Sequence, residues 1–168
     1  MNTFGVASAV CYKDISRVSR SCVDIPERNQ VPNSILDGDI NTKFLSRDGP
    51  GTVVAFTMDN TATNCSVLKY YITSSEDSPH RNPQDFKLYG KSSAESTYTL
   101  LDTKVGITWG DELTAHTPQY FDVDESELVG DWDEFLLEVI DTIYDAIGST
   151  ASHRYLQFSE FGLYGDCN

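Results

Sequence analysis

Side chains that could bind a hard cation are concentrated in one short loop, residues 37–42. Four of its six residues have side chains that carry oxygen, and they surround one glycine: Asp37, Asp39, Asn41 and Thr42. Calcium binds six to eight oxygen atoms from carboxylates, carbonyls and hydroxyls, which a loop of this composition can supply. Apolar pairs at 35–36 and 44–45 are expected to anchor both ends of the loop in the core. The loop therefore predicts a cation site.

Two other interpretations of this loop are open. The spacing of Asp37, Asp39 and Asn41 matches the opening of an EF-hand, but that motif needs glycine at its sixth position and glutamate at its twelfth. The chain has Thr42 and Asp48 at those positions, and its flanks are rich in β-forming residues. The second alternative is an Asx-rich turn without a metal. The residues at these positions and the β-rich flanks argue against an EF-hand, and the number of oxygen atoms favours a cation site over a turn without a metal.

The composition limits the classes of partner. The chain has 168 residues, which suits a single domain, residues 1–168, with a sizeable core. No apolar run approaches the roughly 18 residues of a membrane span, so we predict none. The net charge of −14 argues against binding to a nucleic-acid backbone or to an anionic lipid surface. Twelve acidic residues and no lysine or arginine lie in residues 105–153, a pattern typical of a hydrated face.

Four cysteines bear on the redox compartment: Cys11, Cys22, Cys65 and Cys167. The chain has no C-x-x-C pair, which argues against a zinc site. The even count is typical of a secreted protein with two disulfide bonds, so we expect a secreted or extracellular location, although no signal peptide is visible. The sequence leaves all three pairings open, and we favour a bridge from Cys167 to the N-terminal region. The alternative is four reduced thiols in an intracellular adaptor.

Short runs of β-branched and aromatic residues alternate with turn signals along most of the chain. The expected strands cover residues 6–15, 52–58, 66–73, 85–90, 98–102, 119–123 and 155–164. Seven or eight short strands of this kind predict an all-β antiparallel sandwich.

The segment 132–147 does not fit this pattern clearly. Its apolar residues fall at the spacing of an amphipathic helix. Residues 134–141 could equally form a strand, and because the surrounding chain is all-β we predict the strand.

Four stretches of the sequence, taken together and in order, resemble a known family. They are Asp37-Gly38-Asp39-x-x-Thr42-Lys43-Phe44, then Val67-x-x-Tyr70-Tyr71-Ile72-Thr73-Ser74, then Arg81-Asn82-Pro83-x-x-Phe86-x-Leu88-Tyr89-Gly90, and finally Leu156-Gln157-Phe158-Ser159-Glu160-Phe161-x-Leu163-Tyr164-Gly165. This order is similar to the galactose-binding-like β-sandwich superfamily, which includes discoidin (factor V/VIII type C) domains and carbohydrate-binding modules of family 32. The resemblance covers about residues 34–165.

The resemblance implies an eight-stranded jelly-roll sandwich with a structural calcium ion at the 37–42 loop. The implied ligands are the carboxylate of Asp37, the carbonyls of Ser34 and Asp39, the hydroxyl and carbonyl of Thr42, and the carboxylate of Glu160. A cation bound in this way would tie the first loop of the core to the last strand.

The resemblance also implies a carbohydrate ligand of the galactose type, held by loops at one end of the sandwich. Sugars are bound by an aromatic ring against their apolar face and by charged or amide groups that contact their hydroxyls. The candidate ligand residues are Glu76, Asp77, His80, Arg81, Trp109, His116, His153, Arg154 and Tyr155. Each has a structural alternative: Arg81 could pair with a nearby acid, and Trp109 could belong to the core.

The expected function is that of a non-catalytic, lectin-like module in a secreted protein. The chain has no Gly-x-Ser-x-Gly, no glycine-rich phosphate loop and no HExxH motif, so we do not expect an enzyme. The competing class is a structural or adhesive extracellular protein that uses the same sandwich to assemble with protein partners.

Overall fold

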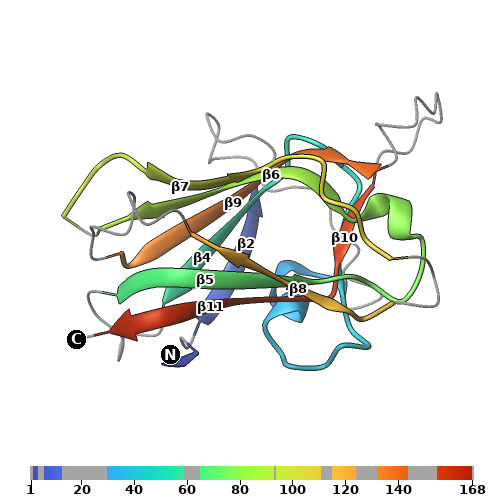
Figure 1. Ribbon diagram of the computed structural model, residues 1–168, viewed down its shortest axis with the longest axis horizontal. Helices are drawn as coiled ribbons and strands as arrows, with labels where there is room; N and C mark the ends of the chain where they lie inside the picture. Colours follow the sequence, from blue (N-terminus) through green and yellow to red (C-terminus); the bar gives the residue numbers. More distant parts are fainter. Residues whose placement is uncertain are drawn as a thin grey trace.

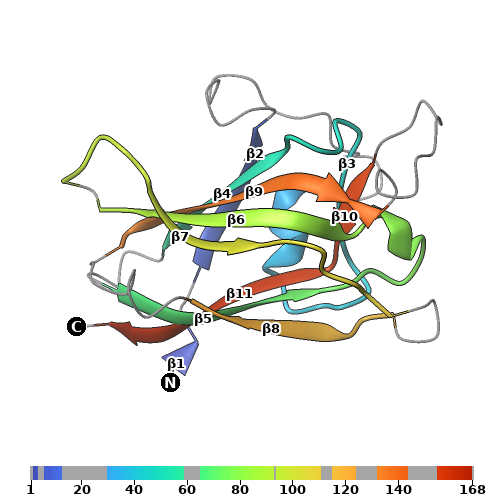
Figure 2. The same ribbon diagram turned by 45° about the horizontal axis from the view of Figure 1, so that its top comes forward.

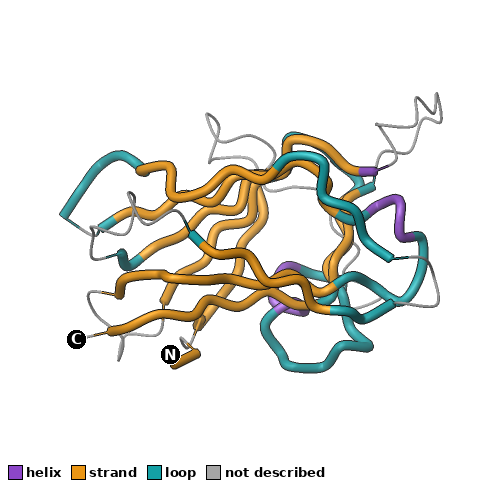
Figure 3. The backbone as a smooth tube through the Cα atoms, viewed as in Figure 1, coloured by secondary structure: helices purple, strands orange, loops and turns teal. Residues whose placement is uncertain are grey.

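The fold is known from a computed structural model of the chain (Figure 1). The structure describes residues 2–3, 6–12, 30–58, 65–92, 94–110, 115–123, 132–143 and 155–167. Within these ranges the regular secondary structure is β-strand, apart from two single-turn 3-10 helices, η2 (Pro32–Ile35) and η3 (Pro79–Arg81), and loops join the strands (Figure 3).

Two antiparallel sheets form the layers of a sandwich (Figures 1 and 2). The five-stranded sheet has the order β2 (Val6–Tyr12), β4 (Val53–Met58), β9 (Glu134–Thr142), β6 (Pro83–Lys91) and β7 (Thr99–Lys104). The four-stranded sheet has the order β1 (Asn2–Thr3), β11 (Glu160–Cys167), β5 (Cys65–Thr73) and β8 (Pro118–Asp122). A third, two-stranded sheet pairs β10 (Leu156–Phe158) with β3 (Phe44–Ser46).

The predicted all-β antiparallel sandwich is confirmed, but the predicted number of eight strands is too low. The described residues contain eleven strands, including the short β1 and β3 that the sequence pattern did not mark. The last predicted strand is also divided in two. The chain bends at Ser159, whose backbone N–H donates to the Thr73 carbonyl at 2.9 Å, and it passes there from the small sheet to the four-stranded sheet.

The ambiguous segment is a strand, as predicted, and β9 occupies the centre of the five-stranded sheet between β4 and β6. Phe135, Leu136, Leu137 and Val139 are all fully buried or nearly so. A central strand covered on both faces has a continuous apolar run instead of an alternating one. That run produced the apparent helical spacing.

The core lies between the two large sheets and is rich in aromatic rings. Phe56 stacks on Phe161 with ring centroids 4.1 Å apart, which joins the two layers. The Tyr70 ring is fully buried, and its hydroxyl donates to Asp102 at 2.7 Å, so this polar atom is satisfied inside the core. The sandwich therefore forms a rigid base for the loops that connect its strands.

The backbone register bears on the disulfide pairing. Cys65 and Cys167 are directly opposite each other where β5 pairs with β11. Opposite residues of antiparallel strands have Cα atoms about 4.5–5.5 Å apart, within the range that a disulfide bond requires. We therefore expect a Cys65–Cys167 bond, in place of the bridge from Cys167 to the N-terminal region that the sequence suggested. Cys22 lies outside the described residues.

Peptide mapping without reduction tests this pairing. We expect a peptide pair that contains Cys65 and Cys167 and that separates after reduction. A link from Cys167 to Cys11 or Cys22, or a free thiol at either strand position, would contradict it.

Candidate functional site

Five residues bring their oxygen atoms together at the edge of the sandwich: Ser34, Asp37, Asp39, Thr42 and Glu160. We call this group the oxygen cluster. The Thr42 hydroxyl is 3.0 Å from the Ser34 carbonyl oxygen, 2.8 Å from Asp37 Oδ2 and 2.9 Å from the Asp39 carbonyl oxygen. Glu160 comes from the first residue of β11 and interacts with the Asp37 carboxylate and with the backbone N–H of Gly38.

The oxygen atoms around the Thr42 hydroxyl outnumber the protons that it can donate. A hydroxyl has one proton and can donate it to one acceptor at a time, whereas carbonyl and carboxylate oxygens only accept. Three acceptors nevertheless lie within 3.0 Å of this one hydroxyl. At least two of these oxygen–oxygen approaches therefore lack a shared proton, an arrangement that a bound cation would stabilise.

The burial and ionisation of Glu160 also favour a bound cation. The residue is 5% exposed, and its Oε1 is buried without a hydrogen-bond partner among the described residues. Burial, and then the charge of the nearby Asp37 carboxylate and the hydrogen bond to it, raise the pKa of Glu160 to about 7. Two adjacent carboxyl groups in such a site cannot both ionise cheaply unless a cation is added.

The loop itself is shaped by bonds that need no metal. Asp37 Oδ1 accepts the Asp39 N–H at 2.8 Å, and Asp39 Oδ1 accepts the Asn41 N–H at 3.0 Å. Gly38 between them has a φ of +74°, a conformation that glycine adopts without strain. These Asx turns direct the Asp39 side chain into the loop and its carbonyl toward Thr42.

The donor set determines which metals fit. The described part of the chain contains no group of three or more His, Cys, Asp or Glu side chains placed to hold a metal. The oxygen cluster provides two carboxylates, Asp37 and Glu160, and its other donors are carbonyl and hydroxyl oxygens. Hard cations accept such donors, whereas zinc prefers nitrogen and sulfur.

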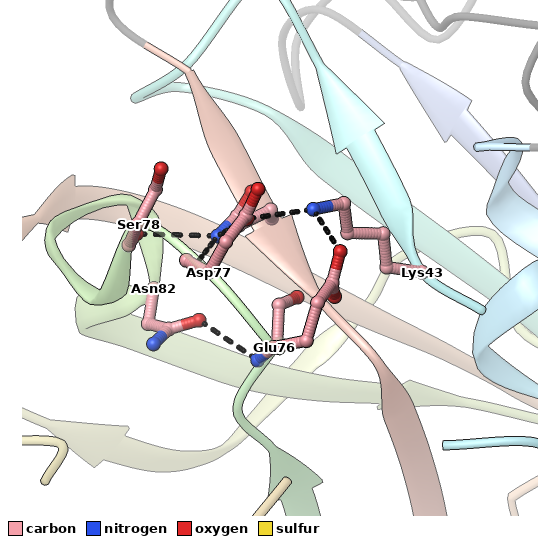
Figure 4. Close-up of polar contacts among 7 residues, drawn as sticks. Lys43, Glu76, Asp77, Ser78 and Asn82 are labelled. Carbon is pink, nitrogen blue, oxygen red and sulfur yellow. Dashed lines mark hydrogen bonds and ion pairs between the residues drawn. The ribbon is translucent and has the colours of Figure 1, made fainter. Parts of the chain in front are cut away.

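The 74–82 loop, which contains several candidate ligand residues, lies at the end of the sandwich opposite the chain termini (Figure 1). It is held by a buried lysine that the sequence did not single out. Lys43 is 5% exposed, and its Nζ is 2.7 Å from both Glu76 Oε1 and Asp77 Oδ1 (Figure 4). These two acids were expected to contact a ligand, but one carboxylate oxygen of each accepts a hydrogen bond from Lys43.

Gln157, in the middle of β10, also holds this loop. Its side-chain amide donates to Asp77 Oδ1 and to the Ser78 carbonyl, both at 3.2 Å, and also to the Asp77 carbonyl. Burial opposes ionisation of Asp77, but the hydrogen bonds from Lys43 and Gln157 and the charges of Lys43 and Arg81 outweigh it and lower the Asp77 pKa. The Asp77 side chain is still 55% exposed and can face a ligand.

Arg81 and Tyr155 come together beside this loop. The guanidinium carbon of Arg81 is 4.8 Å from the centroid of the Tyr155 ring, the geometry of a cation–π contact. Both residues are half-buried, and His80 precedes Arg81 on η3. The ring limits the motion of the guanidinium, and its planar set of donors stays close to Asp77.

The other candidate ligand residues have mixed outcomes. For Trp109 the structure agrees with the alternative of a core residue: it is 8% exposed, belongs to the core, and donates from Nε1 to the Pro83 carbonyl at 2.5 Å. His116 is half-buried on a turn with a φ of +61°, and the adjacent Thr117 bonds to Ser74 through two contacts of 3.3 Å. His153 and Arg154 lie outside the described residues.

Comparison with known proteins establishes the fold. No protein-family model and no curated protein sequence matches the chain. An F5/8 type C domain from Bacteroides fragilis matches with a TM-score of 0.66, 13% identity and 99% coverage of each chain. A family 32 carbohydrate-binding module from Clostridium perfringens, solved with GalNAc-β-1,3-galactose, matches with a TM-score of 0.62, 7% identity and 94% coverage of each chain.

A third match is the family 32 module of Clostridium perfringens NanJ, solved with galactose, with a TM-score of 0.61, 12% identity, and coverage of 96% of this chain and 98% of that one. The chain therefore has the galactose-binding-like sandwich fold that these domains share. No helix among the described residues is long and apolar enough to cross a membrane.

Proposed function

We propose that the protein is a non-catalytic carbohydrate-binding module that binds a glycan of the galactose type at the 74–82 end of the sandwich. The observation that carries this proposal is the Arg81–Tyr155 pair beside the exposed face of Asp77, on a fold shared with modules solved with galactose and GalNAc-β-1,3-galactose. A secreted or extracellular location suits such a module.

The geometry supports a division of roles within the site. Arg81 has a planar set of donors that is already ordered by Tyr155, so little side-chain freedom is lost when it binds neighbouring sugar hydroxyls. The exposed faces of Glu76 and Asp77 supply acceptors for further hydroxyls. The edge of the Tyr155 ring can contact the apolar face of a sugar.

We also propose that the oxygen cluster holds a calcium ion with a structural role. Ser34, Asp37, Asp39, Thr42 and Glu160 would supply its oxygens, and the proton-poor contacts of Thr42 and the unpartnered Oε1 of Glu160 support this. Calcium would supply the positive charge that these groups lack. The ion would tie the 37–42 loop to the start of β11.

Replacing Arg81 with alanine tests the ligand site. We expect at least a tenfold loss of affinity for galactose-type glycans in isothermal titration, because a charged donor pair is lost, with a melting temperature within a few degrees of the wild type. Arg47→Ala removes another, exposed arginine and is the matched control. Unaltered glycan affinity in Arg81→Ala would remove this end of the sandwich from the ligand site.

A second function, assembly with protein partners, is favoured by one surface feature. Tyr71, Tyr120 and Tyr164 form a cluster on the outer face of the four-stranded sheet, with ring centroids 5.7–6.2 Å apart. Tyr120 is 54% exposed there. Aromatic residues of this kind are enriched at protein interfaces. A chain that binds no glycan but forms oligomers by light scattering would support this alternative.

A further inference from the structure

The oxygen cluster and the 74–82 loop are joined through adjacent residues of the chain. Thr42 makes several contacts within the cluster, one of them to Asp37. The side chain of the next residue, Lys43, bonds to Glu76 of the loop. Lys43 is almost fully buried, and both of its bonds to Glu76 and Asp77 are 2.7 Å long. A shift of the Thr42 backbone would therefore displace the anchor of the loop directly.

A second connection runs through the other end of the cluster. Glu160 is three residues from Gln157, whose fully buried side chain donates to Asp77 and to the Ser78 carbonyl. Between them the Ser159 N–H donates to the Thr73 carbonyl at 2.9 Å, which ties the bend between β10 and β11 to the end of β5. Lys43, which follows Thr42 in the chain, and Gln157, which lies near Glu160, thus both bond to the same acid, Asp77. Figure 4 shows the bond between Lys43 and Asp77.

The loop needs these anchors because its backbone is strained. Ser78 has φ of 47° and ψ of 57°, the left-handed conformation that residues other than glycine adopt at a cost of about 1–3 kcal/mol. Such a conformation persists only where surrounding contacts hold it. Gln157 holds the Ser78 carbonyl, which also accepts the Arg81 N–H at 2.9 Å. The position of Arg81 therefore depends on the position of Ser78, which Gln157 holds.

We propose that cation binding in the oxygen cluster orders the 74–82 loop through Lys43 and Gln157, and that the cation and the glycan therefore bind with positive cooperativity. This inference rests on the proposed function for its two ligands. Coupling between two sites is reciprocal, so calcium should tighten glycan binding by the same factor by which the glycan tightens calcium binding. We expect a factor of about 5 to 150, the usual range for such coupling.

The first test uses calcium alone and needs no glycan. Hydrogen exchange of the amides at 75–82 is measured with calcium and with EDTA, in the wild type, in Lys43→Met and in the surface control Lys69→Met. Lys69 also pairs with an acid, Asp122 at 3.1 Å, but on an exposed face. Calcium is expected to slow exchange at 75–82 severalfold in the wild type and in Lys69→Met, and to have little effect in Lys43→Met.

The second test measures the affinity for galactose with calcium and with EDTA. We expect the calcium-dependent gain to disappear in Lys43→Met and to return in part in Lys43→Arg, which keeps a buried cation. If Lys43→Met does not fold, Ser78→Gly gives a second test of the coupling. Glycine adopts the left-handed conformation at position 78 without strain, so the loop depends less on its anchors and the effect of calcium on galactose affinity should be smaller.

The outcomes separate this inference from the proposed function. Protection of 75–82 by calcium that depends on Lys43, without any galactose binding, would support the coupling and count against the carbohydrate ligand. Galactose binding of equal strength with calcium and with EDTA, together with unaltered exchange at 75–82, would overturn the coupling and leave the carbohydrate ligand in place.

Discussion

Removal of calcium with EDTA is expected to lower the free energy of unfolding by about 3 kcal/mol, when the ion is initially present at about one hundred times its dissociation constant. The physical reason is that the ion binds the folded oxygen cluster, whereas the unfolded chain does not assemble it. Asp37→Ala should cost about as much as chelation, because both remove the same ion. Melting curves with calcium and with EDTA measure the effect.

The same experiment has a pH dependence of known sign. Without calcium, the folded state keeps a proton on Glu160 up to a pKa of about 7, whereas the ordinary value is 4.5. Between these values the folded state binds more protons than the unfolded chain, so stability falls as the pH rises. Calcium would displace the proton and favour the ionised carboxylate. The loss of stability between pH 4.5 and 7 should therefore disappear when calcium is present.

Glu160→Gln separates the charge from the ion. The variant keeps the shape of the side chain but cannot ionise. In EDTA at pH 8 it is expected to be more stable than the wild type, because the buried charge is gone, and calcium should no longer stabilise it. A melting temperature of the wild type that does not change on chelation, or a Glu160→Gln variant that calcium stabilises as strongly as the wild type, would exclude the cation site.

The second large effect is expected at Trp109, where truncation to alanine should cost about 3–5 kcal/mol. The indole is buried in the core, and its N–H satisfies the Pro83 carbonyl at the start of β6. Two further hydrogen bonds hold the residues just before Trp109 against β6. The Gly106 N–H donates to Asp85 at 2.8 Å, and the Ile107 N–H donates to the Gln84 carbonyl at 3.1 Å. Removing the ring leaves a cavity and an unpaired carbonyl.

Urea unfolding measures this prediction, with Trp109→Phe as the matched variant. Phenylalanine retains most of the apolar contact and loses the hydrogen bond, so its cost should be a fraction of that of alanine. If the Trp109→Ala protein has wild-type stability but has lost its glycan affinity, the core assignment is contradicted, and Trp109 belongs to the ligand site.

Much of the fold could be predicted because its strands carry local signals. Phe86 and Leu88 alternate with polar residues, and both are fully buried as the pattern indicates. The last part of the chain was harder, because Phe158 and Phe161 both face the core although their spacing breaks the alternation. The bend at Ser159 restores the register, and a change of sheet leaves no clear mark in the sequence.

The residues that hold the candidate site were less accessible to sequence reasoning. Lys43 bonds to Asp77 across 34 residues, and Gln157 bonds to the same acid across 80. Only the fold brings such partners together. Gln157 also lies between two apolar residues of a strand, a position that usually indicates a solvent-facing side chain, but β10 is buried throughout. Trp109 gave no local signal to distinguish a core residue from a platform.

The most direct measurement of the central proposal is binding of the calcium-loaded wild-type protein to an array of glycans. We expect binding to a defined group with terminal galactose or N-acetylgalactosamine, and inhibition by free galactose. Absence of binding to every glycan, by a protein that is folded and responds to calcium in melting curves, would contradict the carbohydrate-binding function.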